Sequence, residues 1–119
     1  MPLKILTIED DRMITDFLNA LLTIYEMQVI VANDGATGIQ MARAESPDLI
    51  LLDLMMPVIN GWEVCHTIRS FSQVPIIVVS AVSNQEKIVS ALSAGANAFM
   101  EKPISIEDLI SQIKHFTAY

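Results

Sequence analysis

The stretch Leu49-Ile50-Leu51-Leu52-Asp53-Leu54-Met55-Met56-Pro57 predicts a buried strand that ends in one carboxylate. Four consecutive large aliphatic residues without polar alternation are typical of a strand covered on both faces, as in the parallel sheets of α/β proteins. Pro57 and Asn60-Gly61 are turn and helix-start signals, so the chain leaves the sheet just after Asp53. Ligands bind at this carboxyl edge in open α/β sheets. Asp53 is therefore either a functional carboxylate or only the cap of the next turn or helix.

The same strand-then-helix pattern repeats on both sides of this stretch. Short apolar runs predict further strands at 4–9, 28–32, 75–80 and 97–101. Apolar residues three and four positions apart predict helices at about 10–25, 35–44, from 61 onward, 83–94 and 106–117. Five such units imply right-handed crossovers and a parallel sheet with helices on both faces, which is a doubly wound α/β fold. Because no linker divides the chain, we expect one domain over residues 1–119.

Composition narrows the classes of function. The chain has 119 residues, 52% of them hydrophobic, and a formal net charge of -7. That charge opposes attraction to phosphate backbones and anionic membranes, so we expect no nucleic-acid or membrane binding by this domain alone. A single cysteine, Cys65, excludes an internal disulfide and a cysteine metal cage. Without a signal-peptide pattern or an apolar run long enough to span a bilayer, the sequence predicts a cytoplasmic domain.

Polar residues follow four of the five predicted strands, where a parallel sheet brings them to one edge. They are the acidic run 9–11, Asp53, Ser80 and Lys102. If the third strand neighbours the first, Asp10, Asp11 and Asp53 converge, and two like charges ~4 Å apart repel by about 4 kcal/mol at an effective dielectric of ~20. A divalent cation with oxygen ligands offsets that repulsion, and Mg²⁺ suits a few carboxylates that leave room for water and phosphate. Lys102 and Ser80 can hold phosphoryl oxygens, so these residues indicate a site for an anion beside a metal.

Taken together, these motifs resemble the receiver domain of two-component response regulators, including the small single-domain chemotaxis regulators. The resemblance covers essentially the whole chain. It rests on motifs in the family's order and spacing: Asp10-Asp11, Asp53 followed by Pro57 and Gly61, Ser80-Ala81, and Lys102-Pro103. The family implies a flavodoxin-like sheet with strand order 2-1-3-4-5.

The resemblance also implies a role for each matching residue. Asp53 would accept a phosphoryl group from a histidine kinase or phosphotransfer protein, and Lys102 would bind the phosphate. Mg²⁺ would be held by Asp10, Asp11, Asp53 and the backbone carbonyl of Met55. The domain would promote its own phosphorylation and dephosphorylation without being an enzyme in the usual sense.

The switch pair of the family corresponds to Ser80 and Phe99, although Thr and Tyr are its more frequent occupants. The resemblance implies that the Ser80 hydroxyl turns toward the phosphate and that the Phe99 ring follows it inward. The output face would be formed by the fourth helix, the fifth strand and the fifth helix. A downstream protein, or a second copy of the chain, would bind there.

Other interpretations deserve comparison. A metal-dependent phosphohydrolase with an Asp nucleophile generally needs a second acid two residues later, and Met55 occupies that position. A Rossmann module would need a glycine-rich turn after the first strand, which the acidic run replaces. Taken one at a time, Asp10-Asp11 could serve only a helix start, Ser80 a local backbone contact, Lys102 a solvated strand end and Phe99 the core. The sequence also leaves open a receiver that belongs to a larger DNA-binding or enzymatic regulator.

Overall fold

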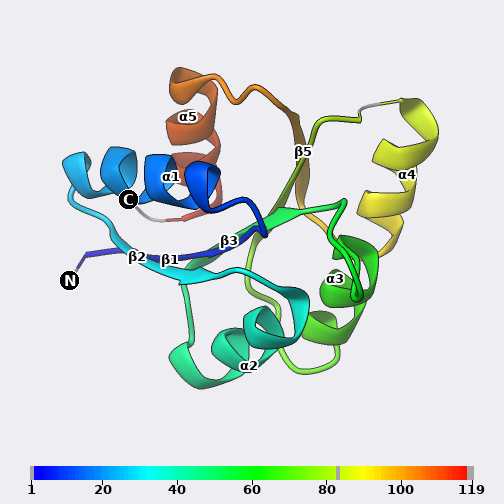
Figure 1. The fold of residues 1–119 in the computed structure, drawn as a ribbon. Helices are drawn as coiled ribbons and strands as arrows, with labels where there is room; N and C mark the ends of the chain where they lie inside the picture. Colours follow the sequence, from blue (N-terminus) through cyan, green and yellow to red (C-terminus); the bar gives the residue numbers. More distant parts are fainter. Residues whose placement is uncertain (1, 83, 118–119) are drawn as a thin grey trace.

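Five parallel strands form the centre of the molecule in the order β2-β1-β3-β4-β5 (Figure 1). The structure is a computed structural model that describes residues 2–82 and 84–117. The strands are β1 (Lys4–Ile8), β2 (Gln28–Ala32), β3 (Leu49–Asp53), β4 (Ile76–Ser80) and β5 (Ala98–Glu101). The helices are α1 (Arg12–Ile24), α2 (Gly35–Glu45), α3 (Gly61–Arg69), α4 (Gln85–Ser93) and α5 (Ile106–Phe116). The predicted doubly wound fold and strand order are confirmed.

The two central strands explain why the sheet is covered on both faces. Every residue of β3 and of β4 is buried. Alternate residues serve two cores: Ile50 and Ile76 pack with α2, α3 and α4, whereas Leu51 and Ile77 pack with α1 and α5. Figure 1 shows α1 and α5 on one side of the sheet and α2 and α3 on the other. Continuous apolar runs are what a strand buried on both faces requires.

Side-chain caps fix where the helices begin. Asp34, Asn60 and Ser105 each accept a hydrogen bond from a backbone N–H in the first turn of α2, α3 and α5. The start of the fourth helix was expected at 83, which lies outside the described residues, and the cap of α4 is Asn84. Because a cap satisfies one of the free N–H groups of a helix, each of these residues contributes about 1 kcal/mol to stability.

Helix α1 buries a narrower face than its apolar pattern predicts. Leu18 and Leu22 are buried, but Met13 is 81% exposed and Phe17 is 53% exposed. These two side chains therefore form part of the surface. Within the described residues, no helix combines the length and the apolar composition that crossing a bilayer requires.

Arg69, at the end of α3, connects the amino ends of β4 and β5. Its guanidinium donates hydrogen bonds to the carbonyl oxygens of Gly95 and Ser72 and to the side-chain oxygen of Asn97, at 2.9, 3.2 and 2.8 Å. The same Asn97 oxygen accepts a hydrogen bond from the N–H of Ile76, the first residue of β4. One side chain thus links α3 to the segments that precede β4 and β5.

The loop between β3 and α3 contains a strained residue. Val58 has a φ of 67°, and its side chain is 99% exposed. A β-branched residue pays steric strain in this left-handed region, whereas glycine does not. We expect Val58→Gly to raise the free energy of unfolding by about 1 kcal/mol in urea denaturation.

The matched control for this prediction is Val89→Gly in α4, where Val89 is 54% exposed and the backbone is helical. Glycine should lower stability there, because it has a poor helix propensity. Equal destabilisation by both substitutions would show that Val58 is not strained.

Candidate functional site

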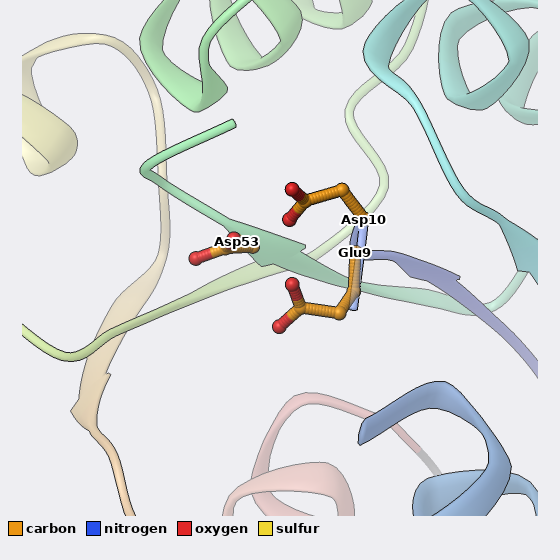
Figure 2. A group of neighbouring side chains, drawn as sticks. All are labelled: Glu9, Asp10 and Asp53. Atoms are coloured by element: carbon orange, nitrogen blue, oxygen red, sulfur yellow. The ribbon is translucent and has the colours of Figure 1, made fainter. Parts of the chain in front are cut away.

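Three carboxylates meet at the carboxyl edge of the sheet. Glu9 and Asp10 follow β1, and Asp53 ends β3, which pairs with β1 up to the level of Ile8 and Leu52. One oxygen of each carboxylate lies within 4.8 Å of the others. Figure 2 shows Glu9 and Asp10 reaching from the end of β1 toward the Asp53 side of the site. Glu9 and Asp53 are only 5% and 6% exposed, whereas Asp10 is exposed.

Lys102, just after β5, supplies the positive charge of the site. Its Nζ lies 2.6 Å from Glu9 Oε1 and 3.5 Å from Asp53 Oδ1. The pKa of Glu9 is raised to about 7, mainly because the carboxyl group is buried; the hydrogen bond to Lys102 opposes this shift and the neighbouring Asp53 carboxylate adds to it. Burial alone would lower the pKa of Lys102, but the hydrogen bond to Glu9 and the charge of Asp53 outweigh it, so the pKa is raised. Lys102 is therefore a fixed cation that bridges two buried acids.

The acidic group differs from the predicted one at a single position. The sequence predicts Asp11 beside Asp10 and Asp53, but in the structure the third carboxylate of the group is that of Glu9. Asp11 is the N-cap of α1, and its carboxylate accepts a hydrogen bond from the N–H of Met13 at 2.9 Å. In this structure the carboxylate of Asp11 is a structural cap.

A local signal distinguishes the three consecutive acids. The residue directly before a helix is the favoured place for an Asp cap, and the helical pattern begins at Arg12. Assigning Asp11 to the cap leaves Glu9 and Asp10 for the sheet edge. Glu9 also continues the strand pairing, since its N–H donates to the carbonyl of Ala32 at 3.0 Å.

Asp53 lies against the backbone of its own loop. Its Oδ1 accepts a hydrogen bond from the N–H of Met55 at 3.4 Å. Gly61 packs directly over the end of β3, because a Cβ at that position would lie 2.5 Å from the carbonyl oxygen of Asp53 and 2.6 Å from Leu54 Cα. The N–H of Gly61 donates to the carbonyl of Leu54 at 2.9 Å. The start of α3 thereby holds the loop that carries Asp53.

Ser80 and Phe99 lie on neighbouring strands and on the same face of the sheet. In the β4–β5 register Val78 pairs with Phe99 and Ser80 pairs with Glu101, so Ser80 and Phe99 share the alternation of Val78. Ser80 is fully buried, and its hydroxyl accepts a hydrogen bond from the N–H of Val82 at 3.2 Å. Phe99 is partly buried against the core on the side of α3 and α4. This placement agrees with the predicted neighbourhood of the two residues.

The donor set of the acidic group fits a hard divalent cation. All three ligand atoms are carboxylate oxygens, and no histidine or cysteine belongs to this group within the described part of the chain. Mg²⁺ prefers oxygen ligands and is commonly bound by a few carboxylates while it keeps several waters. The exposed Asp10 leaves the group open on one side, where water or a phosphoryl oxygen can enter.

An apolar hollow adjoins Lys102. It has a volume of about 540 Å³ and lies between α1 and the segments that follow β4 and β5. Lys102 is one of the residues that line it. The others are apolar: Ile14, Phe17, Leu18, Ala81, Pro103 and Ile104. An exposed apolar surface of this kind beside a charged site is typical of a protein contact.

These features define a doubly wound α/β domain with a buried aspartate, a lysine and an acidic metal-type site at one sheet edge. Residues 5–114 match the family model described as "Response regulator receiver domain". The chain belongs to this family of two-component signalling proteins, as the sequence motifs predicted.

Curated relatives and solved structures agree with this assignment. The chain is 35% identical to response regulator MprA of Mycobacterium leprae over 113 residues and 39% identical to response regulator ArlR of Staphylococcus saprophyticus over 111 residues. These alignments cover 94% and 93% of the chain but only 50% of each relative, so the chain spans about half their length.

Among solved structures, chemotaxis protein CheY4 of Vibrio cholerae has a TM-score of 0.92 at 26% identity, and the alignment covers 98% of this chain and 99% of that one. The BeF3-activated receiver domain of Klebsiella pneumoniae RstA has a TM-score of 0.91 at 27% identity, with 95% and 97% covered. Receiver domains are signalling switches, so the family supports a switch function for this chain.

Proposed function

We propose that this chain is a phosphorylation-dependent signalling switch that accepts a phosphoryl group on Asp53 from a histidine kinase or phosphotransfer protein. The observation that carries the proposal is the position of the buried Asp53 carboxylate, which contacts Lys102 and shares an oxygen cluster with Glu9 and Asp10. A carboxylate can attack phosphorus to form an acyl phosphate, provided that nearby positive charge stabilises the phosphoryl oxygens. Such charge is available on the lysine.

Each residue has a proposed task in this transfer. Glu9, Asp10, Asp53 and the carbonyl of Met55 would hold Mg²⁺, which supplies positive charge to the phosphoryl oxygens when it is bound. Lys102 Nζ, now held between Glu9 and Asp53, would follow the new anionic oxygens on Asp53. The same groups would assist attack by water, so that the domain promotes both its own phosphorylation and its own dephosphorylation.

The signal would leave the site through Ser80 and Phe99. Phosphorylation adds about -1.5 to -2 charges and three acceptor oxygens, and a distant surface responds only if some element has two arrangements. The Ser80 hydroxyl now accepts from Val82, and turning it toward a phosphoryl oxygen would free space for the Phe99 ring. The face formed by α4, β5 and α5 would change shape and bind a downstream protein or a second copy of the chain.

We propose that the apolar hollow beside Lys102 receives the phosphodonor protein. A donor that presents a phosphohistidine must bring it to the open edge of the sheet, and the exposed Phe17 and the lining Ile104 lie next to that edge. Burial of these side chains on association would favour such a complex.

The test of the proposed function is phosphorylation of the purified chain by acetyl phosphate. With Mg²⁺ we expect the intact mass to rise by one phosphoryl group, and with EDTA in place of Mg²⁺ we expect no adduct. An unchanged mass under both conditions, when the acetyl phosphate is shown to be active on another receiver domain, would contradict the proposal.

The structure also predicts which acids bind Mg²⁺. Glu9→Gln should weaken Mg²⁺ binding by about tenfold or more, because one of three carboxylate ligands is lost. Asp11→Asn is the matched control, since Asn caps a helix nearly as well as Asp and the Asp11 carboxylate lies outside the group.

Isothermal calorimetry and the rise of the melting temperature with Mg²⁺ measure both variants. We expect Asp11→Asn to bind Mg²⁺ like the wild type. If Asp11→Asn lost binding while Glu9→Gln kept it, the metal group would be the one predicted from the sequence alone.

A further inference from the structure

A second hollow, with a largely polar lining, opens at the free edge of the sheet, on the opposite side of β5 from β4. β5 is the last strand in the order, and α5 follows it (Figure 1). The hollow between them has a volume of about 340 Å³. Its lining combines one aromatic residue, two acids, two serines, a glutamine and two other apolar residues: Phe99, Glu101, Asp108, Ser105, Ser111, Gln112, Met100 and Pro103.

This lining has the chemistry that recognises a guanidinium group. Glu101 and Asp108 are both exposed, and among the residues that the structure describes no lysine or arginine lines the hollow. Arginine offers five N–H donors in a planar fork that suits carboxylate, amide and hydroxyl acceptors, and its plane stacks on aromatic rings. Phe99 is the aromatic residue among those that line the hollow.

Basic residues on neighbouring elements have contacts of their own. Lys102 is bound to Glu9 and Asp53, and Lys87 of α4 lies 5.0 Å from the ring centroid of Trp62. Lys114 of α5 lines a different hollow, together with Tyr25 at the end of α1. The two carboxylates of the hollow therefore face a partner without a basic residue of their own chain in its lining.

We infer that the hollow between β5 and α5 binds an arginine side chain of a downstream protein partner, set in a short segment that lies along the edge of β5. This inference rests on the proposed function and specifies the chemistry of its output partner. A second copy of the chain is the less favourable occupant. Both copies would carry the same formal net charge of -7, which opposes their association.

The hollow also connects to the proposed switch. Phe99 lines it and, on its other side, packs against the core next to α3 and α4. If the ring turns inward when Asp53 is phosphorylated, the hollow becomes deeper and its carboxylates stay in place. Phosphorylation should therefore strengthen arginine binding without adding any new charge to the hollow.

The test uses a short capped peptide with one arginine between apolar residues, and the same peptide with citrulline, which keeps the shape but lacks the charge. Binding is followed by NMR shifts of the ¹⁵N-labelled chain, with and without beryllofluoride and Mg²⁺. We expect the arginine peptide to shift the NMR signals of residues 99–101 and 105–112. Its affinity should be higher in the presence of beryllofluoride. Citrulline should bind about fivefold more weakly, as the loss of an exposed charged contact implies.

Matched variants locate the site. Glu101→Gln should weaken the arginine peptide by about fivefold. Glu107→Gln is the control, since Glu107 is on the same turn of α5 as Asp108. It should leave the affinity unchanged, because Glu107 lines the hollow of Lys114 and Tyr25. Equal binding of both peptides, or equal effects of both variants, would overturn the inference.

Two further outcomes distinguish an error in the arginine site from an error in the proposed function. Beryllofluoride shifts around residues 53–57 and 102 without any peptide binding would contradict the arginine site and leave the proposed function intact. Absence of those shifts would contradict the proposed function itself. If sedimentation showed that beryllofluoride makes the chain dimerise, and Glu101→Gln blocked the dimer, the occupant would be a second copy and the inference of a separate partner would be wrong.

Discussion

Asp53→Asn is expected to abolish phosphoryl incorporation from acetyl phosphate and Mg²⁺ completely. The substitution keeps the shape of the side chain and an oxygen that can accept from the Met55 N–H, but it removes the carboxylate nucleophile. The two neighbouring acids are poor substitutes. Glu9 is held by Lys102 at 2.6 Å, and burial raises its pKa to about 7, while Asp10 lies at the exposed side of the group.

The control for this experiment is Asp48→Asn, just before the amino end of the same strand. Asp48 accepts a hydrogen bond from the N–H of Lys4 at 2.7 Å and is far from the acidic group along β3. We expect its phosphorylation to equal that of the wild type by intact mass. A phosphoryl adduct that persists in Asp53→Asn would show that another residue is the acceptor.

Gly61→Ala is expected to cause the largest loss of stability among the substitutions considered. The added methyl group would lie 2.5 Å from the Asp53 carbonyl oxygen and 2.6 Å from Leu54 Cα, and both are backbone atoms that no side-chain rotation can move. Overpacking of a buried position costs about 3 kcal/mol in severe cases. We therefore expect the free energy of unfolding to fall by about 3 kcal/mol and the melting temperature to fall by about 10 °C.

His66→Ala in α3 is the control, because His66 is exposed and a surface substitution usually changes stability by less than about 0.5 kcal/mol. Urea denaturation and thermal melting measure both variants. In Gly61→Ala the displaced loop should also slow phosphorylation of Asp53 in the folded fraction. A stability equal to that of His66→Ala would mean that α3 can move away from β3 without cost.

The sequence predicts the central strands well because the signal for their burial lies within the strands themselves. In β3 and β4 every residue is buried, so an uninterrupted apolar run is sufficient to recognise them. The edge strand is less well defined: it was expected to begin at 97 but begins at Ala98. Asn97 instead turns its side chain to Arg69 and Ile76, which lie 28 and 21 residues away along the chain, and no local pattern reveals such partners.

The site follows the same division between local and distant information. Asp53 and Lys102 were predicted from their places after strands, and the structure brings their charges within 3.5 Å. The choice among Glu9, Asp10 and Asp11 depends on whether a residue continues a strand or caps a helix. Moving the strand end or the helix start by one residue changes that choice, and apolar periodicity does not define these boundaries to one residue. The hollow between β5 and α5 could not be predicted, because its walls come from two elements whose distance only the fold determines.

The contacts of Arg69 have a mechanical consequence for the whole domain. They fasten α3, the segment after α4 and the starts of β4 and β5 at the edge of the sheet opposite to Asp53. A helix anchored at one end pivots about that end, so its displacement is smallest there. For α4 the anchored end is at Ala94 and Gly95, so any displacement caused at the site should increase toward Asn84. The amplitude of motion would then rise steadily from the last turn of α4 to its first.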